Sequence, residues 1–264
     1  MKKSILLVLA IAATQVASAA NDSTEGTDTG SEVAATTNEF GLLRVDSALT
    51  DTIVAVPWLD LSGDSSPSSV KVADIVKTAN LTEGDRLSAY KPDGTYDVWV
   101  LDDGEWVPST TAVVDNNEVS EAPAATSRTL ALGGAFWLYR QNPTTSGGAA
   151  VPFYVYGQVS DAAVTTAVTA GTAETPVWNL VANASDAPFA LNPAVTGAGA
   201  SDEIYLVSEG APTKYTLKDG VWGSIVVQTV DGRTVRRWTA ADVTISKGTG
   251  FWYVSKGGSP TFNW

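Results

Sequence analysis

From Phe40 to the C-terminus the chain consists of short apolar runs separated by turn-forming residues. The runs are rich in Val, Ile, Tyr, Phe and Trp, and Gly, Pro, Asn and Asp lie between them, which is typical of β-strands. Asp103-Gly104 and Asp219-Gly220 are dipeptides favoured in two-residue hairpins. Helix is scarce: the pattern predicts one short helix over Val70–Ala79 and a single helical turn over Thr239–Asp242.

One series of motifs occurs twice in the same order. Its members lie 115 to 120 residues apart and pair as follows: Trp58 with Trp178, Asp85 with Asp202, Tyr96 with Tyr215, Trp106 with Trp222, and Trp137 with Trp252. A repeat of this kind, together with short strands and frequent turns, predicts an all-β fold of two tandem sandwich-like or small barrel-like modules related by internal duplication. We place module 1 at residues 40–159 and module 2 at residues 160–264.

The repeat also predicts which tryptophans are buried. Because they recur in both copies, we expect the pairs Trp58/Trp178, Trp106/Trp222 and Trp137/Trp252 to belong to the cores. Alternation along the strand at residues 96–101 predicts that Tyr96, Val98 and Val100 face inward, with Asp97, Trp99 and Leu101 on the other face. Trp99, Trp238 and Trp264 then remain for other roles.

The N-terminus has the features of a secretory signal peptide over residues 1–20. Lys2 and Lys3 precede the apolar run Ile5–Ala13, and Ala17-Ser18-Ala19 forms a small-residue cleavage site. The apolar run is shorter than the roughly 20 residues that a membrane span needs. Residues 21–39 hold little that can be buried and predict an acidic disordered linker. We therefore expect an exported protein, located in the periplasm, on the outer-membrane surface or outside the cell.

The net charge limits the classes of partner, and the absence of cysteine limits how the fold is stabilised. The formal charge is −13, and it becomes −15 without the signal peptide, because 14 basic residues then face 29 acidic ones. This argues against nucleic acid or an anionic membrane as a partner. The chain has no cysteine, so it must be stable through packing alone. No later segment predicts a transmembrane helix, and the sequence leaves the oligomeric state open.

The second copy resembles a known bacterial module. It contains Trp178-Asn179-Leu180, then Ile204-Tyr205-Leu206, then Gly248-Thr249-Gly250-Phe251-Trp252. Together with the two-copy layout, these motifs resemble an uncharacterised two-module secreted β-protein family of verrucomicrobial bacteria. The first copy departs from the pattern, with Pro57-Trp58-Leu59-Asp60 in place of Trp-Asn-Leu. The resemblance implies the fold and export, and it carries no catalytic residues.

Histidine is absent from the chain, and this excludes several enzyme classes. Ser-His-Asp triads, Cys-His pairs and the usual catalytic zinc sites all need residues that it lacks. Nothing singles out a carboxylate pair of the kind a glycosidase uses. We expect no enzymatic activity, no cofactor and no metal site. Asp60 and Asp64, in a polar loop, are weak candidates for a Ca²⁺ site.

These features predict a surface or matrix component, or a binding module, whose partner is a surface protein or a glycan. One alternative is a carbohydrate-binding protein that uses an exposed tryptophan. Its candidate ligand-binding residues are Trp99 and Trp238, together with Arg236 and Arg237 of the basic cluster before Trp238. A second alternative is a small outer-membrane β-barrel, because the chain ends in an aromatic residue, Trp264. The strands are short and interrupted for such a barrel, and Trp264 more simply ends the last strand of module 2.

Overall fold

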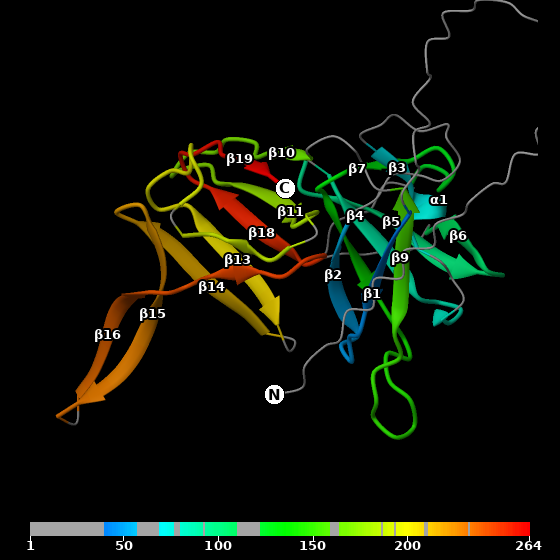
Figure 1. The fold of residues 1–264 in the computed structure, drawn as a ribbon, viewed down its shortest axis with the longest axis horizontal. Coiled ribbons are helices and arrows are strands. Elements are labelled where there is room, and N and C mark those ends of the chain that lie inside the picture. The colour runs from blue at the N-terminus through cyan, green and yellow to red at the C-terminus, as the bar shows by residue number, and fades with distance from the viewer. Residues whose placement is uncertain are drawn as a thin grey trace, which may run out of the picture.

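The computed structural model describes residues 40–56, 69–76, 80–91, 93–109, 122–158, 164–185, 187–192, 194–208, 211–231 and 233–264. This part of the chain is mostly β and contains two main antiparallel sheets (Figure 1). No helix in it is long and apolar enough to cross a membrane. The predicted signal peptide, the linker, Trp58, Asp60 and Asp64 lie outside the described residues.

The first main sheet has five strands in the order β2-β8-β4-β5-β6. Two short ladders, β1–β9 and β3–β7, accompany it. The elements are β1 (Phe40–Val45), β2 (Asp51–Ala55), β3 (Ser69–Lys71), α1 (Val72–Ile75), β4 (Arg86–Tyr90), β5 (Tyr96–Asp102), β6 (Glu105–Pro108), β7 (Thr129–Ala131), β8 (Ala135–Tyr139) and β9 (Phe153–Gln158).

The second main sheet has six strands in the order β11-β18-β13-β14-β15-β16, with the ladders β10–β19 and β12–β17 beside it. The elements are β10 (Thr165–Ala167), β11 (Val177–Ala182), β12 (Phe189–Ala190), β13 (Glu203–Ser208), β14 (Ala211–Lys218), β15 (Val221–Val230), β16 (Arg233–Ala240), β17 (Thr244–Ile245), β18 (Gly250–Ser255) and β19 (Thr261–Asn263). In chain order, β11, β13, β14, β15 and β18 take the same places in this sheet as β2, β4, β5, β6 and β8 take in the first.

Each main sheet packs one face against its own ladders. In the first core, Trp106 and Leu138 of the sheet cluster with Leu130 of β7 and Phe153 of β9. In the second core, residues of the sheet such as Trp222 and Tyr253 cluster with residues of the ladders such as Ile245 and Phe262. The expected burial of Trp106 and Trp222 is therefore confirmed. Trp264 follows β19 and packs against the second core, with its ring stacked on Phe262 at 5.1 Å.

The predicted turns are confirmed and the predicted helices are mostly wrong. Asp103-Gly104 and Asp219-Gly220 join paired strands with positive φ at both residues, the backbone that a two-residue type I′ turn requires. The helix expected over Val70–Ala79 is only the four residues of α1, and Val76 is already extended. No helical turn forms over Thr239–Asp242, because β16 runs on to Ala240.

A buried aspartate holds the same place beside each main sheet. Asp85 accepts hydrogen bonds from the backbone amides of Thr82 and Gln141, at 3.0 and 2.8 Å. Asp202 accepts them from the backbone amides of Gly199 and Lys256, both at 2.7 Å. Each aspartate thereby ties the loop before its own strand to the end of a distant strand.

The two main sheets contact each other through the faces that point away from their cores. Ile53, Ala55 and Ala135 of the first sheet cluster there with Ala182 of the second, and the half-buried Trp137 and Trp252 pack against them. The contact is reciprocal: the amide of Ala55 donates to the carbonyl of Gly248, and the amide of Ala182 donates to the carbonyl of Gly133, both at 3.1 Å. Trp137 and Trp252 are thus covered by the contact between the halves, not by the separate cores.

The predicted phase of β5 is wrong. Trp99 and Leu101 belong to the first core, and Tyr96 and Val100 are only half-buried. The error arose because Asp97 looks like a solvent-facing residue, yet it is buried and lies 3.4 Å from Lys91 and 3.3 Å from Arg128. Both faces of β5 carry apolar residues, so alternation alone does not fix which face is inward.

Candidate functional site

The face of the six-stranded sheet that points away from the second core carries aromatic and charged side chains. The first sheet covers part of this face, and Trp178 and Lys214 are exposed on it. Its side chains follow from the strand register, because alternate residues of each strand share a face. One row across the sheet is Trp178, Val254, Glu203 and Thr216, and the next row is Leu180, Trp252, Tyr205 and Lys214. The intervening residues, such as Ile204, Leu217 and Tyr253, fill the core. We call this surface the outer face.

Five aromatic rings form a continuous cluster at one end of the outer face. Trp178 lies 5.2 Å from Tyr205 and 5.8 Å from Trp252, measured between ring centroids. Tyr90 meets Trp252 edge-on at 4.8 Å, and Tyr96 lies 5.3 Å from Tyr90. Trp178 and Trp252 come from adjacent strands, whereas Tyr90 and Tyr96 come from the first sheet. We call these five residues the aromatic cluster.

Trp178 is the exposed member of this cluster. Its relative exposure is 43%, whereas its four neighbours are half-buried. The expectation that Trp178 is a core residue, like Trp222, is therefore wrong. No local sequence signal indicates this exposure, because the expected burial of Trp178 rests only on its match with Trp58.

A charged network adjoins the aromatic cluster on the same face. Glu203 Oε1 accepts hydrogen bonds from the ammonium groups of Lys214 and Lys256, both at 2.5 Å, and the Tyr205 hydroxyl donates to Oε2 at 2.9 Å. Burial raises the pKa of Glu203, but the hydrogen bonds from Lys214, Lys256 and Tyr205 outweigh burial and leave the pKa below its usual value. The hydrogen bond to Glu203 raises the pKa of Lys214. The network keeps both signs of charge beside the rings.

The candidate residues Trp238, Arg236 and Arg237 lie together on β16. Trp238 is half-buried on the outer face: its ring covers Gly223, its Nε1 donates to the carbonyl of Thr216 at 3.4 Å, and the ammonium group of Lys218 lies 5.8 Å from the ring centroid. Arg236 and Arg237 are exposed on opposite faces of the strand. The structure therefore places Trp238 at the far end of the outer face from Trp178.

Trp99 does not belong to this surface. Its relative exposure is 0%, and its Nε1 donates to the carbonyl of Pro123 at 2.8 Å. In the hairpin register, Leu101 pairs with Trp106 as Leu217 pairs with Trp222. Trp99 therefore takes the place of Tyr215, and the expected match of Tyr96 with Tyr215 is wrong. The prediction of an exposed Trp99 available to a ligand is wrong.

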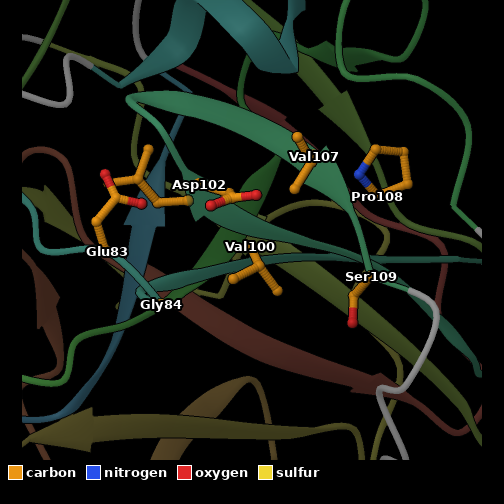
Figure 2. A pocket seen from close by; sticks show the side chains of 8 residues that line it. Glu83, Gly84, Val100, Asp102, Val107, Pro108 and Ser109 are labelled. Carbon is orange, nitrogen blue, oxygen red and sulfur yellow. The ribbon is translucent and has the colours of Figure 1, made fainter.

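A separate open depression lies beside the β5–β6 hairpin of the first sheet (Figure 2). It has a volume of about 340 Å³, and Figure 2 shows the carboxylates of Glu83 and Asp102 beside the apolar side chains of Val100, Val107 and Pro108. Glu83 accepts hydrogen bonds from the backbone amides of Asp103 and Gly104, at 2.9 and 3.2 Å. Sequence reasoning did not identify this depression.

The buried carboxylates serve structural bonds. Asp85, Asp97, Asp202 and Glu203 all have the amide, hydroxyl or cationic partners given above. Within the described ranges, no three Asp, Glu, His or Cys side chains come together as a metal-binding group. No family model matches the chain, and neither a curated protein nor a solved structure matches it.

Proposed function

We propose that this chain is an exported, non-catalytic binding protein that recognises a glycan through the outer face of its six-stranded sheet. The observation that carries the proposal is the exposure of Trp178, 43%, within a cluster of aromatic rings that holds it in place. Tryptophan is enriched at interfaces, where its ring packs against a partner.

The chemistry of the outer face suits a sugar. A pyranose ring has an apolar C–H face that can stack on an indole, and hydroxyl groups around its rim that need hydrogen-bond partners. Trp178 and Tyr205 offer the rings, while Lys214 and Lys256 offer donors beside them. Trp238 stands four strands away from Trp252, which at the usual strand spacing is about 19 Å. The face is therefore long enough for an extended oligosaccharide.

The bonding of the carboxylates supports a non-catalytic role. A carboxyl group that works as a general acid or base must be able to exchange a proton with the substrate. Glu203, which accepts a hydrogen bond from Tyr205 of the aromatic cluster, is also held by Lys214 and Lys256. It is suited to orienting these three side chains.

We also infer that the halves arose by internal duplication and then diverged in role. The support comes from the recurring motifs, the shared strand order and the equivalent bonds of Asp85 and Asp202. In the register of the first sheet, the places of Trp178 and Tyr205 are taken by Asp51 and Ser88. Only the second half would therefore carry the binding rings, while the first half supports them with Tyr90 and Tyr96.

Binding to a panel of soluble polysaccharides tests this proposal. In affinity electrophoresis or calorimetry, Trp178→Ala should weaken binding about tenfold or more, because one stacking contact and its buried apolar area are lost. Tyr154→Ala is the matched control, since Tyr154 is a half-buried aromatic residue of β9, away from the outer face. Equal binding by wild type and Trp178→Ala, or no binding to any member of the panel, would refute the proposal.

A further inference from the structure

The β15–β16 hairpin extends beyond the body of the protein (Figure 1). β15 pairs with β14 only from Val221 to Gly223, so the part from Ser224 to Val230 has β16 as its partner strand. This outer part is exposed on both of its faces, and its apolar residues Ile225, Val227, Val230 and Val235 have relative exposures of 58%, 59%, 49% and 44%. We call residues 224–231 and 233–237 the arm.

An arm of this composition is poorly stabilised by itself. A two-stranded hairpin is at best marginally stable in water without a packed face, and β-branched residues contribute to a sheet mainly when a neighbour covers them. The arm places Val227 on one face and Val230 on the other. Contact with another surface would bury apolar residues on one face of the hairpin and could cover an open edge.

The positive charge of the arm favours contact with an acidic surface. The described part of the arm carries Arg233, Arg236 and Arg237 against one acid, Asp231, whereas the whole chain has a net charge of −13. Two copies of this chain repel each other overall, so any attraction is local, between the arm of one copy and an acidic site of the other. The β16 strands of two molecules could also pair antiparallel, centred on Arg236. This pairing would place equivalent arginines opposite each other, which is unfavourable. The charges favour contact between the arm and a different surface of the second copy.

The depression beside the β5–β6 hairpin has the complementary properties. Asp102 and Glu105 are exposed at its hairpin, and Val107 and Pro108 offer apolar contact. It belongs to the first sheet, and Figure 1 shows β6 and the arm at opposite ends of the long axis. The arm of one molecule therefore meets the depression of another molecule, not its own.

We propose that the chain associates with itself head to tail, the arm of one copy docking in the acidic depression of the next. Such a contact joins two different surfaces, so it does not close into a symmetric dimer, and it produces rows or rings of molecules. Substitutions in the arm leave the aromatic cluster intact, because Trp178 lies on β11, the opposite edge strand of the six-stranded sheet.

Sedimentation velocity of the purified full chain, over a range of concentrations, tests this inference. We expect reversible oligomers at an ionic strength of about 0.02 M that weaken at about 0.5 M, because salt screens exposed charges. Arg233→Glu/Arg236→Glu/Arg237→Glu should weaken association at least about tenfold, and Ile225→Ser/Val227→Ser should also weaken it. Arg44→Glu, at an exposed arginine of β1, should leave association unchanged.

A charge exchange gives the sharpest result. Asp102→Lys/Glu105→Lys should weaken association alone, yet this variant mixed with the arginine-to-glutamate variant should form hetero-oligomers. A wild-type chain that stays monomeric at low salt would overturn the proposal, whether or not its arm binds an acidic polysaccharide. Stronger association after replacement of the arginines would also overturn the proposal. Such a result would mean that the arginines on the open edge prevent pairing between molecules.

Discussion

The hydroxyl of Tyr253 donates a 2.5 Å hydrogen bond to Oδ2 of Asp202, and both residues are buried in the second half. Burial, followed by this bond, raises the pKa of Tyr253. Asp202 also accepts two backbone amides, and Asp85 accepts the equivalent two in the first half. In the first half, Leu138 takes the place of Tyr253. Leu138 pairs with Leu87, Tyr253 pairs with Ile204, and Leu87 and Ile204 are equivalent positions.

We predict that Asp202→Asn destabilises the protein by about 2–3 kcal/mol, because a buried acceptor of three hydrogen bonds becomes partly a donor. Asp85→Asn should cost about 1–2 kcal/mol, since it lacks the hydroxyl partner. Urea unfolding followed by tryptophan fluorescence measures both. Losses below about 0.5 kcal/mol at both sites would show that these bonds do not hold the loops to the sheets.

The acid sensitivity of the protein should depend in part on Glu203. Its pKa lies below the ordinary value of 4.5, so its ionised form adds stability that is present above that value and lost as the pH falls through the lowered pKa. Glu203→Gln should remove this part of the acid dependence. Thermal unfolding of wild type and variant between about pH 3 and pH 7 measures it. Parallel profiles for the two proteins would contradict the prediction.

Truncation should destabilise the protein much more at Trp99 than at Trp178. Trp99→Ala opens a cavity in the first core and should cost about 3–5 kcal/mol of stability. Trp178→Ala removes a side chain that is 43% exposed, and it should cost about 1 kcal/mol or less while it weakens ligand binding. Chemical unfolding separates the two variants. A Trp178→Ala protein as unstable as Trp99→Ala would mean that Trp178 serves the fold.

The hairpin turns and two buried tryptophans can be predicted from the sequence, whereas the inward face of β5 cannot. Asp103-Gly104 and Asp219-Gly220 could be placed in hairpins, because few other residues tolerate positive φ at both positions. Trp106 and Trp222 were correctly expected to be buried from their recurrence. The phase of β5 could not be obtained this way, because the strand is apolar on both faces and the ion pairs of Asp97 come from Lys91 and Arg128, which only the folded chain brings near.

The candidate site was partly accessible from the sequence. Trp238, Arg236 and Arg237 form a cluster in the sequence and share β16, but Arg236 and Arg237 lie on opposite faces of the strand. Their role in ligand binding stays a prediction. The aromatic cluster was not identified, because it joins Tyr90 and Tyr96 of one sheet to Trp252 of the other. Its assembly depends on the contact between the sheets, and no local pattern encodes that contact.

The contact between the halves should tolerate no added side chain at Gly250. A Cβ at this position would lie 2.1 Å from Cγ2 of Ile53 and 3.0 Å from Cβ of Ala135. We predict that Gly250→Ala costs about 1–3 kcal/mol and separates the halves enough to lower their cooperativity of unfolding. Gly257→Ala is the control, since Gly257 is exposed and a Cβ there meets nothing within 4 Å.

Scanning calorimetry measures the number and temperature of the unfolding transitions. The wild type should unfold in one transition, and Gly250→Ala should unfold at a lower temperature in a broader or divided one. An unchanged transition in Gly250→Ala, equal to that of Gly257→Ala, would show that the halves are not held together by this close approach.

The outer face as a glycan-binding surface is tested most directly by nuclear magnetic resonance of the indole N–H groups during titration with an oligosaccharide. The chain has nine tryptophans, and those of the two cores, Trp106 and Trp222, provide internal references. We expect the signals of Trp178 and Trp252 to shift with the ligand while those of Trp106 and Trp222 stay in place. Shifts confined to other indoles, or no shift with any bound glycan, would contradict it.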